Sequence, residues 1–222
     1  MKIIASALLI SLLTLGPTVR SQATDCEQVL QNLKDLYGDL PGISMDYNRH
    51  VITRSLSMTG EKVIGDFAEG RLYFKPPHFM KLVQIRPVEE HLITEGRNVW
   101  WYVPEKARVE RYPASFFGKQ LSLLSEVFQG FPEGSRSFAC RIEIVGGSTV
   151  VVLNPDPPWK DIDHVAVTLG SENSISTIDI RNNLGNVTRF TLGPFTVEES
   201  FARDFFTYSP PEGIRMEDMG HH

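Results

Sequence analysis

The stretch from residue 70 to residue 104 constrains the fold more than any other part of the chain. Short runs rich in apolar residues follow one another there, and none of them contains a catalytic motif. The breaks between the runs are Pro76-Pro77, Pro87 and Glu95-Gly96. Proline has no N–H to donate to a neighbouring strand and glycine favours tight turns, so this spacing predicts antiparallel hairpins.

The last of these runs carries large apolar side chains on both faces. Successive side chains of a strand point to opposite sides, so Val99, Trp101 and Val103 share one face. Trp100 and Tyr102 share the other. We therefore expect one face to pack in a core and the other to form a cavity wall or a covered surface.

The start of the chain has the features of a secretory signal peptide, which we place at residues 1–23. Lys2 supplies a positive charge, and residues 3–15 form an apolar run that is too short to span a bilayer. Ser21 and Ala23 are small residues at the right positions for cleavage.

A lipoprotein signal is the competing interpretation, because Cys26 follows this segment closely. Asp25 argues against it, since such a cleavage site needs a small residue directly before the cysteine. We therefore expect a soluble exported protein.

Residues 24–219 have the length of a single domain with a sizeable core, and residues 220–222 resemble part of a purification tag. Removing residues 1–23 takes away Lys2 and Arg20, so the formal charge goes from −5 to −7. No nucleic-acid partner is expected, because phosphates need a basic face. No second apolar run approaches the roughly 20 residues of a membrane-spanning helix.

Two cysteines remain after export, Cys26 and Cys140. An oxidising compartment favours a single disulfide between them, which would tie the start of the domain to its second half. The alternative is that both are unpaired, buried thiols.

A helix is expected at the start of the domain. Thr24 and Glu27 have the spacing of a capping box, and Gly38 followed by Pro41 provides a stop. Apolar residues recur between them at helical intervals, at Val29, Leu33, Leu36 and Tyr37. This apolar stripe needs a sheet to pack against.

Strand-like runs cover residues 43–109 and resume after residue 138, with a helical insertion at residues 112–138 between them. The apolar residues of the insertion are Phe116, Phe117, Leu121, Leu124, Val127 and Phe128. Regularly spaced strands with few helices predict a mainly β fold with some α. We expect a large antiparallel sheet that is curled into a barrel or half-barrel.

No arrangement of residues indicates catalysis or metal binding. The histidines outside the tag lie on separate predicted elements, without the spacing of a metal site: His50, His78, His91 and His164. Asp161 and Asp163 beside His164 have the composition of part of a triad, but no nucleophile motif accompanies them and a solvated turn is the simpler interpretation. We expect neither an enzyme nor a bound cofactor or metal ion.

Several short motifs occur in a fixed order. In the first half they are Lys75-x-Pro77, Pro87, Glu95-Gly96 and Trp100-Trp101-Tyr102, and near the end they are residues 205–214, FFTYSPPEGI. This order resembles the LolA family of periplasmic outer-membrane lipoprotein carriers, whose members close on Phe-x-Phe-x-Pro-Pro-x-Gly-Val. With the signal peptide and the first helix, the likeness covers nearly the whole mature chain.

The resemblance implies an incomplete antiparallel β-barrel, or half-barrel, covered by a helical lid. The barrel would enclose an apolar cavity for the acyl chains of lipoproteins. It also implies three partners: acylated lipoproteins as cargo, an inner-membrane ABC transporter of the lipoprotein-release type, and an outer-membrane receptor lipoprotein. We expect a monomer in the periplasm of a Gram-negative bacterium.

The resemblance also implies cavity residues. Met80 and Leu82 lie where the family has aromatic cavity residues, and Leu92 matches an aliphatic one. Strand parity adds Leu72, Phe74 and Trp101 as cavity candidates, while the lid candidates rest on the helical pattern: Phe116, Phe117, Leu121 and Leu124. The alternative is that these side chains only pack the core.

One position departs from the family pattern. Family members often carry an arginine directly before a conserved proline, and this arginine holds the lid closed by hydrogen bonds. In this chain Pro76 occupies the position of the arginine. Proline offers no donor, so we expect a lid that is held mainly by apolar contacts.

Two rival functions stay open. One is a carrier of another lipid, such as a glycolipid, and the other is a protein that senses lipoproteins within a stress-signalling complex. An enzyme that acts on lipids would need a converging serine, histidine and acid in its pocket.

Overall fold

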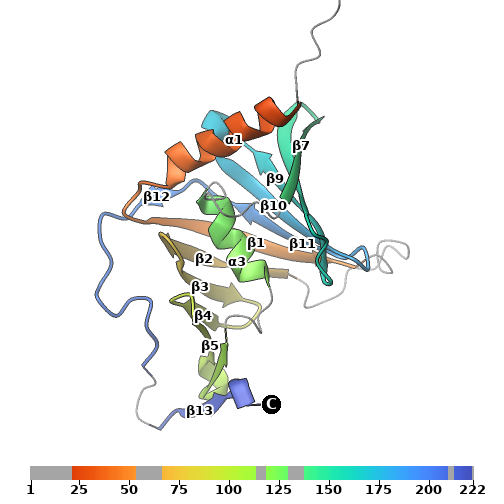
Figure 1. Cartoon of the computed structure of the whole chain (residues 1–222). Helices are drawn as coiled ribbons and strands as arrows, with labels where there is room; N and C mark the ends of the chain where they lie inside the picture. Colours follow the sequence, from red (N-terminus) through yellow and green to blue (C-terminus); the bar gives the residue numbers. More distant parts are fainter. Residues whose placement is uncertain (1–21, 54–66, 114–118, 130–137, 210–212, 222) are drawn as a thin grey trace, which may run out of the picture.

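A single curled sheet dominates the computed structural model, which describes residues 22–53, 67–113, 119–129, 138–209 and 213–221 (Figure 1). The strands in these residues are β1 (Ile43–Ile52), β2 (Phe67–Lys75), β3 (Phe79–Arg86), β4 (Glu90–Thr94), β5 (Asn98–Val103), β6 (Arg108–Pro113), β7 (Phe138–Val145), β8 (Ser148–Pro155), β9 (Ile162–Leu169), β10 (Ile175–Asn182), β11 (Val187–Leu192), β12 (Thr196–Val197) and β13 (Arg215–Asp218). Short 3-10 helices also occur: η1 (Pro104–Lys106), η2 (Ser171–Asn173) and η3 (Met219–His221).

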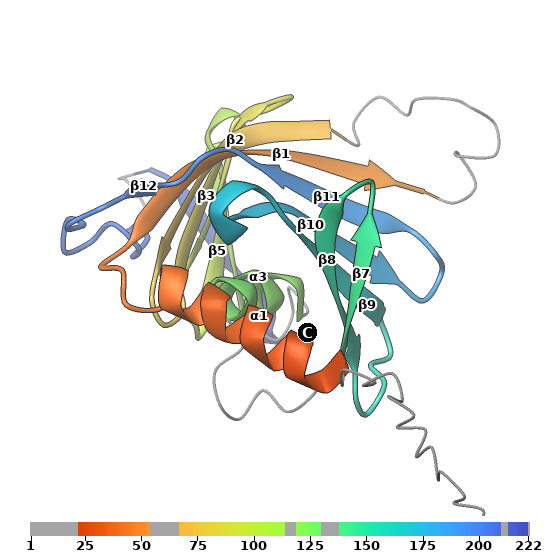
Figure 2. The same cartoon turned by 90° about the horizontal axis from the view of Figure 1, so that it is seen from above.

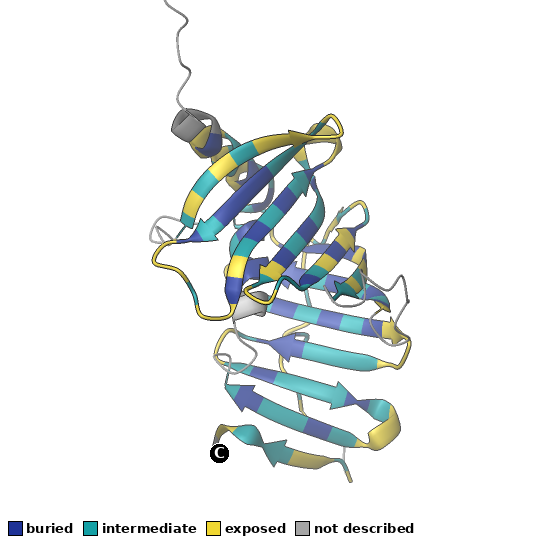
Figure 3. Cartoon of the chain, turned by 90° about the vertical axis from the view of Figure 1, so that its right-hand side faces the viewer, coloured by how far each residue is buried: buried dark blue, intermediate teal, exposed yellow. Residues whose placement is uncertain are grey.

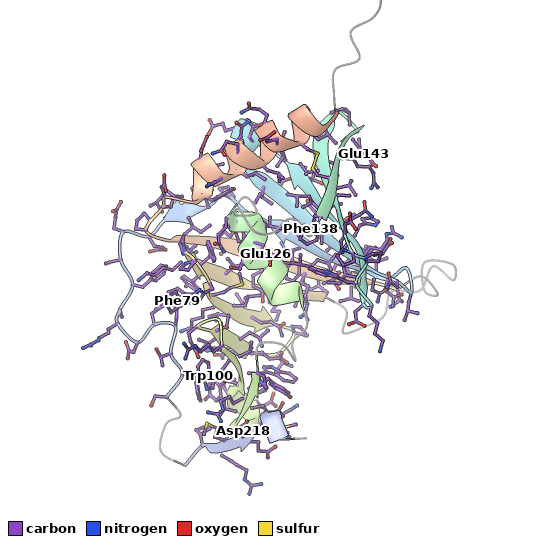
Figure 4. The ribbon with its side chains drawn as sticks, in the orientation of Figure 1. Phe79, Trp100, Glu126, Phe138, Glu143 and Asp218 are labelled. Atoms are coloured by element: carbon purple, nitrogen blue, oxygen red, sulfur yellow. A yellow bond between two sulfur atoms is a disulfide. The ribbon has the colours of Figure 1, made fainter. Side chains whose placement is uncertain are left out.

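The order across the sheet is β13-β6-β5-β4-β3-β2-β1-β11-β10-β9-β8-β7, and β12 pairs with the start of β1. Neighbouring strands pair antiparallel, as expected, except that β13 runs parallel to β6. In the described residues the edges β7 and β13 do not pair with each other. Figure 4 marks these two ends by Glu143 on β7 and Asp218 on β13, with Glu126 on the helix between them.

The α-helices lie across the concave side of the sheet (Figure 2). Within the described residues they are α1 (Gln22–Tyr37) and α3 (Lys119–Phe128). An unclosed antiparallel sheet with helices over its open side confirms the predicted half-barrel with a helical cover.

Helix α1 differs from the prediction at its start and agrees with it at its end. It begins at Gln22, so the predicted cap at Thr24 is wrong, because the preceding Gln22 and Ala23 are good helix formers that extend the helix. The helix ends at Tyr37, and the N–H of Gly38 donates to the carbonyl of Lys34 at 2.7 Å.

A disulfide joins Cys26 on α1 to Cys140 on β7. The predicted bond is therefore confirmed, and the alternative of two free thiols is wrong. The bond fastens α1 to one edge strand of the sheet, so the helix cannot leave the concave side at that end.

The main core lies between the concave face and the two helices. Buried and less buried positions alternate along these strands (Figure 3). Val151 on β8 pairs with Val167 on β9, which pairs with Ile178 on β10, and all three are almost fully buried. Intervening side chains such as Thr168 point outward and are partly exposed. Leu33 of α1 is among the side chains that complete this core. Each such side chain contributes about 1.5–3 kcal/mol of hydrophobic stabilisation.

The segment after β12 crosses the outer face of the other end of the sheet. The ring of Phe205 lies 5.0 Å from that of Tyr73 on β2, and Nζ of Lys81 on β3 lies 4.5 Å from the Phe205 centroid. Further along, the rings of Tyr208 and Tyr102 on β5 are 5.2 Å apart. The chain then enters β13, and neither this outer cover nor β12 and β13 were predicted.

The predicted helical insertion is shorter than expected. Tyr112 and Pro113 extend β6, because they pair with Val99 and Asn98 on β5. At the other end Phe138 begins β7. Residues 114–118 and 130–137 of the insertion lie outside the described residues.

Candidate functional site

A cavity of about 210 Å³ lies between the concave face of the sheet and α3. Its walls come from β1, β3, β4 and β11, and Leu124 of α3 covers part of it. The lining residues are Tyr47, Arg49, Val51, Leu82, Gln84, Glu90, Leu92, Leu124, Thr188 and Phe190. Strand alternation explains this set, because residues two apart on one strand face the same side.

Strand register places the lining residues of neighbouring strands side by side. Leu82 on β3 pairs with Leu92 on β4, and Arg49 on β1 pairs with Phe190 on β11. Leu92 in turn pairs with Trp101 on β5. Inward-facing residues of separate strands therefore form one continuous, mostly apolar surface beneath α3.

Several polar side chains of the cavity already have partners in the protein. The side-chain amide of Gln84 donates to the carbonyl of Val88 at 2.9 Å, and Oε2 of Glu90 accepts the indole N–H of Trp101 at 3.1 Å. Burial raises the pKa of the Tyr47 hydroxyl to about 12, with nearby Arg49 opposing the shift and Glu90 adding to it. Tyr47 is therefore neutral at any physiological pH.

Arg49 differs from these residues. Its Nε is buried and has no hydrogen-bond partner among the described residues. A buried N–H without a partner costs free energy, so an acceptor that reached this donor would stabilise the cavity wall.

Helix α3 covers the cavity with an apolar face. Leu123, Leu124, Val127 and Phe128 are buried on it. The ring of Phe128 lies 5.4 Å from that of Phe74 on β2. The helix is therefore seated on the sheet by close packing.

Helix α3 is also fastened by hydrogen bonds. Oγ of Ser125 donates to the carbonyl of Pro77 at 3.0 Å, and the side-chain amide of Gln129 donates to the same carbonyl. The prediction that mainly apolar contacts hold this helix is therefore incomplete. Although Pro76 offers no donor, the next residue offers an acceptor, and the helix supplies the donors.

The predicted site residues fall into three groups. Leu82, Leu92 and Leu124 line the cavity. Three others lie on the same concave face but are almost fully buried in the core and do not line this cavity: Leu72, Phe74 and Met80. Trp101 borders the cavity through its hydrogen bond to Glu90. Phe116 and Phe117 lie outside the described residues, and so does the side chain of Leu121.

Sequence reasoning missed the β1 and β11 walls of the cavity. The signal was present in β1, where Ile43, Met45, Tyr47, Arg49 and Val51 alternate with polar residues. An arginine within an otherwise apolar inward row marks a polar position inside the barrel. Alternation along β1 does not show which strand pairs with its other edge, because that pairing depends on residues far away in the sequence.

A second hollow of about 430 Å³ lies near the end of α1, where Tyr37, Gly170, Glu172 and Pro194 are among its lining residues. Serines of the η2 turn also border it, and none of the predicted site residues does. The first cavity is therefore the better candidate for an apolar ligand.

The structure offers little for catalysis or metal binding in its described part. Asp163 and His164 are in contact at 2.8 Å, and the Asp163 side chain is half-exposed. Both residues lie on β9, so the predicted solvated turn is wrong at these two positions. Among the described residues no three His, Cys, Asp or Glu side chains gather in a way that would hold a metal ion. In the same residues, no helix is both long enough and apolar enough to cross a bilayer.

The sequence of residues 58–209 matches the family model described as outer membrane lipoprotein carrier protein LolA. The chain belongs to the LolA family. Similar curated relatives include outer-membrane lipoprotein carrier proteins of Nitrosospira multiformis, 20% identical over 188 residues, and of Halorhodospira halophila, 23% identical over 194 residues. Each alignment covers 83% of this LolA-family chain and 83% of the relative.

A solved structure supports the fold. The crystal structure of an uncharacterized conserved protein from Thermus thermophilus superposes with a TM-score of 0.54 at 9% identity, and the match covers 87% of this chain and 99% of that one. At this identity the likeness concerns the fold alone. It agrees with the half-barrel architecture described above.

Proposed function

We propose that this LolA-family protein is a periplasmic carrier of lipoproteins. It would hold their acyl chains between the concave face of the half-barrel and α3. The observation that carries the proposal is the mostly apolar cavity beneath a helix that Ser125 and Gln129 join to the carbonyl of Pro77. Relatives named as outer-membrane lipoprotein carriers support the same cargo.

Energetics favour such a carrier. Each methylene that leaves water contributes about 0.8 kcal/mol, so the acyl chains of a lipoprotein would cost tens of kcal/mol to expose during transfer between membranes. A protein that buries the chains removes this cost. A binding protein needs no catalytic group, so we propose a carrier and not an enzyme.

The size of the cavity indicates that α3 must move. Pockets for drug-sized ligands hold about 300–1,000 Å³, whereas this cavity measures about 210 Å³. Lifting α3 would expose the buried inward residues next to the cavity. Leu72, Phe74 and Met80 would then join Leu82, Leu92 and Trp101 as ligand contacts, and Leu124 with the other lid candidates would cover the chains.

The route of the cargo follows from the same proposal. An inner-membrane ABC transporter of the lipoprotein-release type would load the carrier, and an outer-membrane receptor lipoprotein would unload it. Residues 1–23 would direct export as a signal peptide, and residues 24–219 would act as one domain and as a monomer. The Cys26–Cys140 bond is consistent with an oxidising compartment.

The limited volume of the cavity also favours a second candidate function, a carrier of a smaller lipid. Native mass spectrometry of the protein recovered from the periplasm of its own host separates the two. A co-purified triacylated lipoprotein supports the leading proposal. A free lipid supports the second, and a bound partner protein without lipid contradicts both.

A pair of variants on one strand tests the cavity itself. Leu82→Glu places a carboxylate in the cavity wall, whereas Ile85→Glu places one on β3 where the side chain is 64% exposed. Desolvating a carboxylate against hydrocarbon opposes binding, so we expect Leu82→Glu to lose its cargo and Ile85→Glu to keep it. Both should retain a cooperative thermal transition. Equal cargo in two folded variants would remove the cavity from the proposal.

A further inference from the structure

Arg49 is an unusual residue in an apolar cavity. It lies on β1 between Phe190 on β11 and Ala68 on β2, and Ala68 is fully buried. A guanidinium stays charged at any physiological pH and carries five N–H donors but no acceptor. Its aliphatic stem suits the apolar wall, and its donors need oxygen atoms.

The protein itself does not satisfy all of these donors. The buried Nε of Arg49 has no hydrogen-bond partner in the described chain. The other polar side chains nearby do not fill this role, because Gln84 is bonded to Val88 and Glu90 to Trp101. The wall of the cavity therefore contains a buried donor without an acceptor.

The charged residues of the cavity favour a neutral acceptor over an anionic one. Arg49 contributes one positive charge and Glu90 one negative charge to the same wall, and the remaining lining residues are neutral. Both charges act on the Tyr47 hydroxyl in this wall, so an anion bound there is attracted by Arg49 and repelled by Glu90. A neutral carbonyl oxygen satisfies the donor without meeting this repulsion.

We propose that Arg49 binds the carbonyl oxygen of an ester or amide that joins an acyl chain to its headgroup, while the chain itself lies on Leu82, Leu92 and Phe190. This inference rests on the proposed carrier function and specifies its ligand. The cavity recognises an acyl linkage and not only hydrocarbon. Such linkages occur in lipoproteins and in free glycerolipids, so the test must separate these sources.

Binding of small amphiphiles to the unaltered protein tests the proposal directly. Monopalmitoylglycerol has the carbonyl, the hexadecyl ether of glycerol lacks it, and palmitate carries a charge in its place. Affinities are measured by displacement of Nile red, an uncharged dye. A hydrogen bond to a charged donor predicts that the ester binds about tenfold more tightly than the ether, and more tightly than palmitate.

Two variants locate the effect. Arg49→Met keeps the aliphatic stem and should reduce the ester-to-ether preference to about onefold. Arg86→Met on β3, where the side chain is largely exposed and pairs with Glu69, should leave the preference unchanged. Native mass spectrometry of Arg49→Met from the host then distinguishes the sources, since loss of a lipoprotein or loss of a free glycerolipid identifies which linkage Arg49 holds.

Each contrary result has a defined meaning. Equal binding of ester and ether, or a preference that survives in Arg49→Met, overturns the inference while leaving the carrier function in place. Tighter binding of palmitate that depends on Arg49 overturns it in favour of an anion site. Failure of the unaltered protein to bind any of the three amphiphiles overturns the carrier function together with the inference.

Discussion

The two ends of the half-barrel use apolar residues in different ways. In β8, β9 and β10 the inward side chains are small, branched and buried, and the outward ones are mostly polar. In β4, β5 and β6 most side chains on both faces are only partly buried, and Trp100, labelled in Figure 4, is among them (Figure 3). The first end is a packed core, and the second is a surface that still has apolar area to cover.

Polar contacts add to the stability of the second end, where fewer side chains are buried. Arg108 pairs with Glu110 and also with Glu217 on β13 at 2.9 Å, and Arg111 pairs with Asp218. Exposed ion pairs contribute about 0–1 kcal/mol each, which is far less than a buried side chain. This difference indicates that the β8–β10 end determines stability, while the β4–β6 end and the cavity beside it adapt to a ligand.

Removing the disulfide should produce the largest effect, and it acts on the packed end. The bond joins residues 114 positions apart, and in the chain-entropy model a loop of about 100 residues contributes up to about 4.7 kcal/mol. We expect the Cys26→Ala/Cys140→Ala variant to lose several kcal/mol of unfolding free energy. Urea denaturation of this variant, beside the oxidised and reduced parent, measures the loss. An unchanged midpoint would show that α1 is held by packing alone.

A matched pair of truncations compares the two ends directly. Ile178 on β10 is fully buried, so Ile178→Ala should cost about 2–5 kcal/mol of unfolding free energy. Leu92 on β4 is partly buried and lines the cavity, so Leu92→Ala should cost about 1 kcal/mol but weaken binding of monopalmitoylglycerol. Denaturation and dye displacement report the two quantities. A larger stability loss in Leu92→Ala would contradict the comparison.

A pair of hydroxyl deletions should change stability only slightly. Oγ of Ser125 on α3 donates to the carbonyl of Pro77 at 3.0 Å. Oγ of Ser176 on β10 donates to the carbonyl of Thr168 at the same distance. Either serine-to-alanine change should cost about 1 kcal/mol. Only Ser125→Ala should loosen the cover of the cavity, seen as faster amide hydrogen exchange in α3 and greater Nile red binding by the empty protein.

Amide hydrogen exchange in α3 decides whether the hydrogen bond of Ser125 holds this helix. Equal exchange rates in α3 for both variants would mean that this hydrogen bond does not hold the helix. Packing of Phe128 on Phe74 would then be the main attachment, in line with the apolar contacts that the sequence predicts.

Local patterns in the sequence predicted the elements and their faces. The run Asn98–Val103 forms β5 as expected, with Val99 and Val103 buried on the predicted common face. The paired cysteines were also predicted, although only as one of two alternatives. These features depend on side-chain alternation and turn residues within a few positions of each other, and a single sequence contains that information.

Other features depended on contacts between distant segments. The pairing of β1 with β11 places Phe190 opposite Arg49, and the parallel pairing of β13 with β6 covers an edge that the pattern left open. Gly70 lies beside a register shift between β2 and β3, where a Cβ would lie 2.1 Å from the carbonyl oxygen of Val83. The sequence by itself therefore determined the strands, their inward faces and the family resemblance. The tertiary structure decided which inward residues meet around the cavity and which donors fasten α3, because alternation is a local property and strand order and helix seating are not.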